Sequence, residues 1–377
     1  MPAPRRNHYT QAVNSDPANA TDWHRFLGRP RLPEPSIAAL DQLCKSSILV
    51  TGAGGSIGSA LSIRLAALRP RQLLLLDASE QALYRLQTSL NDAGLFTRAR
   101  LILGDCANDA LLEEILEPQQ LIFHAAAYKH VPLLEQHPLE AIANNTLATL
   151  TLAEAAEQAG AARIVLLSTD KAAAPASILG ATKRIAERIV LAHGGIALRL
   201  ANVLGTEGSV SETFARQIAA GGPITITTRD AERYFLTCAE AVDLLLASAI
   251  AAPARSLLAP QLTGQHRIAE LARFLSNHLS PALTLPIVFT GRRPGDKPSE
   301  VFWSSDEHPS SSTISGLLQT QPSKSANELP EHILETLREA VNKRDLPLTL
   351  DCITRSVPGY SPSETVMAQL KQSEVTR

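Results

Sequence analysis

The chain has 377 residues, of which 45% are hydrophobic and 19% are charged, and its formal net charge is −2. This length suffices for one large α/β domain with an added lobe, or for two domains. The small net charge gives no reason to expect nucleic acid or an acidic membrane surface as a partner. The four cysteines are far apart and share no metal-ligand spacing. They indicate reduced thiols, and we expect no metal site and no disulfide framework.

No stretch of the chain predicts export or passage through a membrane. The first 23 residues lack the apolar core of a signal peptide. No apolar run reaches the ~18–20 residues that span a bilayer. The longest candidate, 241–258, contains Asp243 and Arg255 and predicts a buried helix. These features favour a cytoplasmic protein with no transmembrane segment.

Apolar segments alternate with amphipathic ones over most of the chain. Residues 1–22 are polar and predict a disordered N-terminus, and residues 23–45 predict a folded lead-in segment. Strands without polar alternation are predicted at 47–52, 71–77, 99–105, 120–127 and 163–170. Helices are predicted between and after them at 58–68, 80–90, 109–116, 140–160 and 181–193. This pattern indicates a Rossmann-type, doubly wound parallel α/β sheet covered on both faces.

The second half of the chain predicts a smaller lobe. We expect the Rossmann domain at 46–200, a substrate lobe at 201–360 that is partly interleaved with it, and a tail at 361–377. The polar stretch 304–328 predicts a loop or linker, and 329–344 predicts one more helix.

The first strand–turn–helix segment reads VTGAGGSIGSA, with glycines at three-residue intervals. Such glycines allow a tight turn and bring the backbone close to a pyrophosphate at a helix N-terminus, where free N–H groups favour anions. The segment therefore predicts an NAD(P) site in the first domain. The residues expected to bind the dinucleotide there are Gly52, Gly55, Ser56, Ile57 and Gly58.

Two acidic residues extend the predicted cofactor site. Asp77 ends the second strand and is placed to bind a ribose 2′-hydroxyl, which favours NAD over NADP. Arg85 nearby leaves NADP possible. Asp105 follows the third strand and is expected at the adenine amino group, with a helix N-cap as the alternative. The alternative for the whole site is a structural glycine turn followed by a solvated strand-end aspartate.

A set of ordered segments carries a resemblance to a known family. They are VTGAGGSIGS, FHAAAYKHVPLLE, LSTDK with GATKRIAE, NVLGTEGSV, QIAAGGPITIT, ERYFLTCAEAV and RRPGDK. Over residues 23–300 the chain resembles the extended short-chain dehydrogenases of polysaccharide biosynthesis, and among them UDP-N-acetylglucosamine 4,6-dehydratases. Many larger members carry transmembrane helices before this module, and the chain is expected to be the catalytic module alone.

The resemblance implies a dehydration in three parts. Hydride leaves sugar C4 for the nicotinamide, a base removes the C5 proton while an acid helps the 6-hydroxyl depart, and hydride returns to C6. By resemblance, Lys171 is the base, Asp170 the acid, Thr169 the hydroxyl at the sugar 4-oxygen, and Lys183 the residue at the nicotinamide ribose. A lysine base needs a lowered pKa, which a half-buried site beside Lys183 is expected to provide. The alternative for Asp170 and Lys171 is an exposed helix-cap pair.

Leu179 stands four positions before Lys183, where many related enzymes have a tyrosine. Leucine cannot exchange a proton. Membrane-attached relatives often have methionine there, so the chain resembles a branch without the tyrosine. Two alternatives to the dehydratase remain open: a UDP-sugar epimerase, and a nucleotide-sugar-binding homologue with little catalysis.

The expected substrate is a UDP-sugar, and the expected assembly is a homo-oligomer. By resemblance, the loop with Lys129 and His130 contacts the sugar, and Asn202 lies where relatives hold the nucleotide-sugar. A surface loop with chance basic residues is the alternative for the first pair. Arg233, Arg293 and Lys297 are expected to clamp the diphosphate, because guanidinium groups bind phosphate oxygens in pairs.

Overall fold

A computed structural model of the chain describes residues 21–282, 284–321 and 329–375. The predicted disorder of residues 1–22 falls almost wholly outside this range. Thr21 is buried and the Asp22 carboxylate accepts N–H bonds at the start of the first helix, so these two residues belong to the folded lead-in segment.

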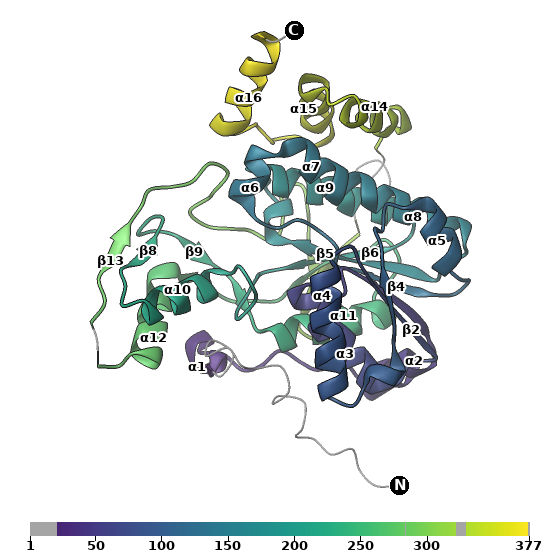
Figure 1. Cartoon of the computed structure of the whole chain (residues 1–377), viewed down its shortest axis with the longest axis horizontal. Helices are drawn as coiled ribbons and strands as arrows, with labels where there is room; N and C mark the ends of the chain where they lie inside the picture. The colour runs from purple at the N-terminus through teal and green to yellow at the C-terminus, as the bar shows by residue number, and fades with distance from the viewer. Residues whose placement is uncertain (1–20, 283, 322–328, 376–377) are drawn as a thin grey trace.

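A nine-stranded sheet forms the centre of the molecule, in the order β14-β15-β11-β6-β5-β4-β1-β2-β3 (Figure 1). All neighbours from β3 to β11 pair in parallel, and β15 and β14 continue the sheet in antiparallel pairing. The parallel strands are β1 (Ser47–Thr51), β2 (Gln72–Asp77), β3 (Arg100–Leu103), β4 (Leu121–His124), β5 (Arg163–Thr169), β6 (Ile196–Leu200) and β11 (Leu257–Pro260). The order 3-2-1-4-5-6 confirms the predicted doubly wound Rossmann-type fold.

Helices cover both faces of the sheet because its strands are apolar on both sides. One face packs against α2 (Ile37–Lys45), α3 (Ser56–Leu68), α4 (Glu80–Asp92) and α11 (Cys238–Ala251). The other face packs against α5 (Asp109–Ile115), α7 (Pro138–Ile142), α8 (Ala148–Gln158) and α9 (Ile178–Ala192). Between α7 and α8 the helix widens into one π-helical turn, η3 (Ala143–Leu147), so the predicted helix 140–160 is continuous but irregular.

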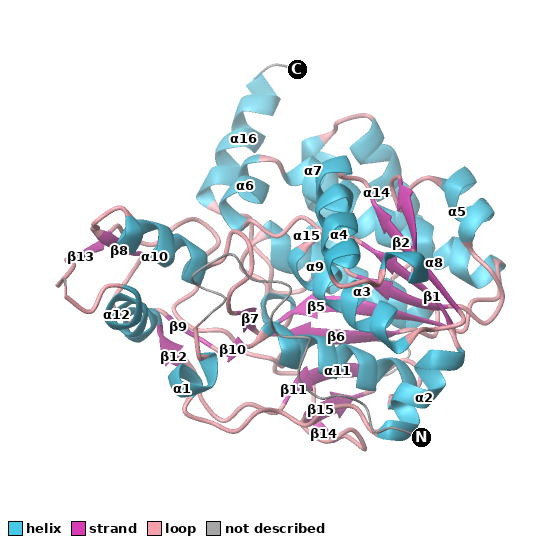
Figure 2. Ribbon diagram, turned by 60° about the horizontal axis from the view of Figure 1, so that its bottom comes forward, coloured by secondary structure: helices cyan, strands magenta, loops and turns pink. Residues whose placement is uncertain are grey.

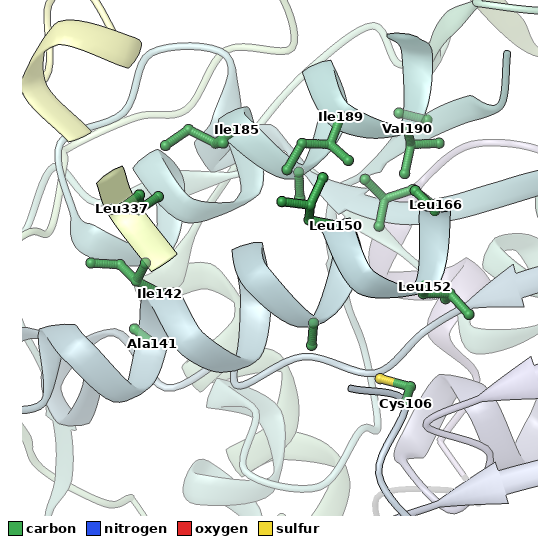
Figure 3. Close-up of a cluster of buried hydrophobic side chains, with 14 of the residues drawn as sticks. Cys106, Ala141, Ile142, Leu150, Leu152, Leu166, Ile185, Ile189, Val190 and Leu337 are labelled. Carbon is green, nitrogen blue, oxygen red and sulfur yellow. The ribbon is translucent and has the colours of Figure 1, made fainter. Parts of the chain in front are cut away.

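The second helical face is covered in turn by the C-terminal helices α14 (Glu331–Asn342), α15 (Leu346–Ser356) and α16 (Glu364–Val375). Figure 3 shows Leu166 of β5 beside side chains of α8 and α9, with Leu337 of α14 near Ile142. The short α6 (Val131–Gln136) links α16 to this layer. These helices therefore close the core on the side of α9 (Figure 1).

A smaller lobe lies beside the carboxyl ends of the strands (Figure 2). Its own apolar core contains Trp23, Phe214, Phe235 and Leu271. Its elements are α1 (Trp23–Leu27), α10 (Val210–Ala219), α12 (Ile268–Leu279), β7 (Asn202–Val203), β8 (Ile224–Ile226), β9 (Glu232–Arg233), β10 (Phe235–Leu236), β12 (His266–Arg267) and β13 (Ile287–Phe289). Two short helical turns are also present, η2 (Phe96–Arg98) and η4 (Asp170–Ala172).

Two predicted elements differ from the structure in their bounds or content. The buried helix predicted for 241–258 is present as α11, but it ends at Ala251, and Leu257 and Leu258 belong to strand β11. The loop predicted for 304–328 contains β14 (Ser310–Ser311) and β15 (Leu317–Thr320). Leu317 is buried because β15 lies in the sheet between β11 and the edge strand β14, a position that the local polar composition does not reveal.

Among the described residues, no helix is long and apolar enough to cross a membrane. Within the same range, no group of three or more His, Cys, Asp or Glu side chains is arranged to hold a metal ion.

Candidate active site

The glycine turn between β1 and α3 has one crowded side and one open side. A Cβ on Gly52 would lie 2.5 Å from the Ala126 nitrogen, and one on Gly58 would lie 2.0 Å from the Gly52 oxygen. A Cβ on Gly55 would meet only that oxygen, at 3.4 Å. Gly55 is also the N-cap of α3 and supplies no side-chain cap to its first-turn N–H groups. Such a turn can accept an anionic group, and binding of a pyrophosphate by the Ser56, Ile57 and Gly58 N–H groups stays a prediction.

Asp77 fastens the glycine turn to the start of α4. Its two carboxylate oxygens accept the Gly54 N–H at 2.8 Å and the Ser79 N–H at 2.9 Å. Each oxygen retains a lone pair, which is what binding of ribose hydroxyls requires. Asp105 accepts the Ala107 N–H, while Asn108 caps α5. The helix N-cap alternative for Asp105 is therefore wrong, and its contact with adenine stays a prediction.

A loop of the smaller lobe, residues 205–209, crosses the glycine turn. The Glu207 N–H donates to Ser56 Oγ at 3.1 Å, and the Glu207 carboxylate lies 3.3 Å from Arg85. Lys129 Nζ donates to the Glu207 carbonyl, and a Cβ on Gly208 would touch the His130 ring. Burial lowers the pKa of both Lys129 and His130, against the raising effect of nearby carboxylates. The two basic residues thus lie beside the predicted cofactor turn.

The three residues at the end of β5 form a contact network. Thr169 Oγ1 donates to Asp170 Oδ1 at 3.0 Å, and Lys171 Nζ donates to the same oxygen at 3.0 Å. Lys171 Nζ also donates to Asn202 Oδ1 of β7 at 3.2 Å. Asp170 is fully buried, and its Oδ2 finds no hydrogen-bond partner among the described residues. The exposed helix-cap alternative is therefore wrong for this pair.

The pKa of Lys171 shifts in the direction opposite to the one expected, and the nearby Lys183 has a lowered pKa. Burial would lower the pKa of Lys171, but the Asp170 and Glu300 carboxylates outweigh burial and raise it. The expected lowered pKa of Lys171 is therefore wrong for this arrangement. Lys183, which is 3% exposed, has its pKa lowered to about 8 by burial, with Glu187 opposing. Lys171 is held as an ammonium beside a carboxylate, and Lys183 is the lysine that burial drives towards neutrality.

The charged residues in and around the 290–300 segment differ in their contacts with the Lys171 region. Lys297 Nζ donates to the Ala174 carbonyl at 2.7 Å. Arg233 donates to the carbonyls of Lys297 and Pro298, at 2.9 and 3.0 Å. The Arg293 side chain is 60% exposed and forms an ion pair with Asp296 of its own loop, at 3.5 Å. The structure places Lys297 and Arg233 against the Lys171 region, whereas the Arg293 side chain is mostly exposed to solvent.

Glu300 is a site residue that the sequence did not predict. It is 2% exposed, and its Oε1 lies 3.9 Å from Lys171 Nζ. No local pattern around it distinguishes it from a solvated glutamate. Its position three residues after Lys297, on a loop expected at the diphosphate, was the one available signal.

A buried polar chain supports the loop after β4. His124 is fully buried, with Nδ1 2.7 Å from Thr51 Oγ1 and Nε2 2.9 Å from Thr149 Oγ1. Because Thr149 donates to the Asn145 carbonyl, it accepts from Nε2–H, and Nδ1 accepts from Thr51. Burial and the charge of Lys183 lower the pKa of His124 to about 3, so the ring stays neutral. Asn145 then holds both backbone groups of Tyr128.

Leu179 is 6% exposed and belongs to the core beneath α9. Its side chain packs with apolar neighbours and offers no proton. The missing tyrosine is therefore replaced by a well-packed core side chain.

A sequence profile described as "Polysaccharide biosynthesis protein" matches residues 48–322. The probable polysaccharide biosynthesis protein EpsC of Bacillus subtilis is 38% identical over 296 residues, covering 75% of this chain and 49% of that protein. A UDP-N-acetylglucosamine 4,6-dehydratase (inverting) of Campylobacter jejuni is 27% identical over 274 residues, covering 70% and 79%. UDP-glucose 4-epimerases of Rickettsia also match, at 28% or 29% identity.

The chain spans about half the length of the first curated relatives that it matches. Among solved structures, a dTDP-glucose 4,6-dehydratase of Streptomyces venezuelae with NAD bound is similar, with a TM-score of 0.61 and 21% identity. That match covers 69% of this chain and 87% of the other, and it supports the fold alone.

Proposed function

Because the chain belongs to the polysaccharide biosynthesis protein family, we propose that it is an NAD-dependent 4,6-dehydratase of a UDP-N-acetylhexosamine. The observation that carries the proposal is the direct contact of Asp170 with Lys171 at 3.0 Å, at the carboxyl end of β5. An acid and a base in contact are what an elimination needs, whereas epimerisation at C4 needs neither at C5 and C6. A relative named as such a dehydratase supports the same choice.

The cofactor site is proposed at the turn between β1 and α3. The open face at Gly55 and the first-turn N–H groups of α3 suit the pyrophosphate. Asp77 repels a 2′-phosphate, and Arg85, the nearby cation, already pairs with Glu207. Both features favour NAD over NADP. Bound NAD would supply hydride acceptance from C4 and hydride return to C6, and the proton of the 4-hydroxyl would leave through Thr169, water or Lys183.

The proton chemistry is proposed for the Asp170–Lys171 pair. One proton transfer along the 3.0 Å bond turns the ammonium–carboxylate pair into a neutral amine and a neutral carboxylic acid. Binding of the sugar against the pair excludes water, which favours the neutral amine of Lys171 and the neutral acid of Asp170. The amine then takes the C5 proton, and the acid gives its proton to the departing 6-hydroxyl, which leaves as water. Thr169 donates to Asp170 and lies next to the position proposed for the sugar 4-oxygen.

The UDP-sugar is proposed to lie between the sheet edge and the smaller lobe. Asn202, Arg233 and Lys297 surround Lys171 from the lobe side. Lys129 and His130 contact Glu207 and Gly208, in the loop beside the glycine turn. Arg293 remains a diphosphate ligand only if its exposed loop folds inward on binding.

The proposal is tested by incubating the purified chain with UDP-N-acetylglucosamine and NAD, and following the nucleotide-sugar by mass spectrometry. Loss of one water is the expected result. A product isomer of unchanged mass would establish the epimerase instead. UDP-sugar binding with no change of mass or isomer would establish a binding protein with little catalysis. That outcome would agree with Leu179, whose side chain cannot exchange a proton.

The Gly55→Asp variant should lose the dinucleotide. The new carboxylate would enter the open space at the turn and repel the pyrophosphate, so we expect NAD binding to fall by at least tenfold in calorimetry. Gly264→Asp adds the same group at an exposed glycine with no heavy atom within 4 Å of an added Cβ, and should bind NAD normally. Equal NAD affinity in Gly55→Asp and the parent would refute the site.

The Arg233→Ala variant should weaken UDP binding and leave NAD binding nearly unchanged. Loss of a charge-assisted phosphate contact costs about 1.5–3 kcal/mol. Arg267→Ala removes an exposed arginine from the neighbouring strand β12 and serves as the control. Unaltered UDP affinity in Arg233→Ala would assign the guanidinium only to holding the 297–298 carbonyls.

A further inference from the structure

A second buried carboxylate lies beside the acid/base pair and comes from a distant part of the chain. Glu300 lies in the loop between β13 and β14, and its two oxygens face two different ammonium groups. Oε1 is 3.9 Å from Lys171 Nζ, and Oε2 is 2.6 Å from Lys297 Nζ. One carboxylate is thus shared between the proposed reacting lysine and a proposed phosphate-binding lysine.

The position of Glu300 is fixed from both sides. Its backbone N–H donates to Gln265 Oε1 at 3.2 Å, and its carbonyl accepts from Gln265 Nε2 at 3.1 Å. Lys297 in turn donates to the Ala174 carbonyl, which follows Lys171 by only three residues. Lys171 and Ala174, three residues apart in the chain, are therefore also linked through Glu300 and Lys297.

The charged groups around Lys171 come from its own segment and from two others. Asp170 adjoins it, Glu300 approaches from the 290–300 loop, and Arg233 of β9 opposes them with a positive charge. Asn202 of β7 contributes a neutral acceptor. A carboxylate that is 2% exposed is costly to bury unless its cations stay in place. Lys171 and Lys297 are the cations that the structure places on Glu300.

We propose that Glu300 is a positioning residue of the acid/base site: it holds the Lys171 amine against Asp170 and balances that amine's charge against the Lys297 ammonium. This inference rests on the proposed function for its kinetic consequence, but the charge balance itself exists without substrate.

The first test needs no turnover. Competitive labelling with acetic anhydride, followed by peptide mass spectrometry, measures the reactivity of Lys171 against pH, with exposed Lys343 as the internal reference. Removing a negative charge destabilises the ammonium, so Glu300→Gln should move the Lys171 curve to lower pH by about one unit or more. Glu300→Asp keeps the charge and should restore most of the parental curve.

The control is Asp306→Asn, an exposed carboxylate of the same segment, which should leave the Lys171 curve unchanged. Lys297→Met tests the balance in the opposite direction. Without the Lys297 charge, Glu300 acts on Lys171 alone, so the curve should move to higher pH. This variant also decides the question if Glu300→Gln does not fold.

The second test is kinetic. If the chain dehydrates a UDP-sugar, the acid limb of kcat for Glu300→Gln should move to lower pH together with the labelling curve. A parent without turnover would refute the proposed function while the labelling result still stands. Superimposed labelling curves for the parent and Glu300→Gln, or for the parent and Lys297→Met, would overturn the inference and leave Glu300 as a loop anchor only.

Discussion

The Lys171→Ala variant is expected to lose the elimination of water, with a fall in rate of about 10²–10⁴-fold. Lys171 is the proposed base, and its Nζ contacts Asp170 and Asn202 at 3.0 and 3.2 Å. Alanine removes both the base and the cation that compensates the fully buried Asp170 carboxylate. The measurement is water loss from the UDP-sugar by mass spectrometry, together with incorporation of solvent deuterium at C5 by NMR.

Ligand affinities distinguish the loss of the base from a loss of folding in Lys171→Ala. NAD and UDP affinities of Lys171→Ala should stay near the parental values, because the glycine turn and Arg233 lie on other segments. Leu179→Met is the matched control on α9: it substitutes a core side chain of similar volume, at a cost below about 1.5 kcal/mol, and should keep activity. Dehydration by Lys171→Ala at the parental rate would refute the proposed base, and Asp170 would have to be tested in that role.

Much of the fold could be predicted because the first five parallel strands are short apolar runs between amphipathic helices. Residues 47–51 are all buried, which makes the strand visible without any partner. The remaining strands are not visible in this way. β15 contains Gln319 and pairs antiparallel at the edge, and β11 directly follows an apolar helix. Their identity depends on the partner strand, which local composition does not encode.

The candidate site could likewise be predicted where its residues are neighbours in sequence, and not where they come from distant segments. Thr169, Asp170 and Lys171 adjoin one another in sequence, and the structure brings them into contact as that adjacency suggests. The charge state of Lys171 could not be predicted, because Glu300 approaches it from a distant loop and reverses the effect of burial. Lys183 shows the converse, since burial outweighs the charge of Glu187, four residues further along α9, and lowers the pKa of the amine.

A buried ion network behind the site anchors the segment that carries Glu300. Arg199 of β6 is fully buried and donates to both Glu187 oxygens of α9, at 2.8 and 2.7 Å. It also donates to both Glu307 oxygens and to the Phe302 carbonyl. Ser168, next to Thr169, donates to Glu187 at 2.6 Å. The network therefore ties β5, α9 and the 302–307 segment together at one point.

The Arg199→Met variant is expected to destabilise the protein by about 3–5 kcal/mol, because removing one partner of a buried ion network leaves uncompensated charge. Arg184 is the remaining cation on the two carboxylates, and it is 20% exposed. Denaturant unfolding at neutral pH measures the loss. Arg338→Met removes an arginine whose ion pair with Glu154 is exposed, and should change stability by less than about 0.5 kcal/mol.

The pH dependence of the stability that Arg199→Met loses identifies the cause of the loss. Burial would raise the pKa of Glu307, but hydrogen bonds and charge from Arg199, with Arg184, lower it from 4.5 to about 2. Because the folded pKa lies below the unfolded one, this stabilisation is present above pH 4.5 and is lost as the pH falls towards 2. The difference in stability between the parent and Arg199→Met should therefore shrink over that interval.

Adding Glu307→Gln to Arg199→Met removes one uncompensated charge and should recover part of the stability at neutral pH. A loss that is independent of pH and unrelieved by Glu307→Gln would assign it to packing around Arg199 rather than to charge.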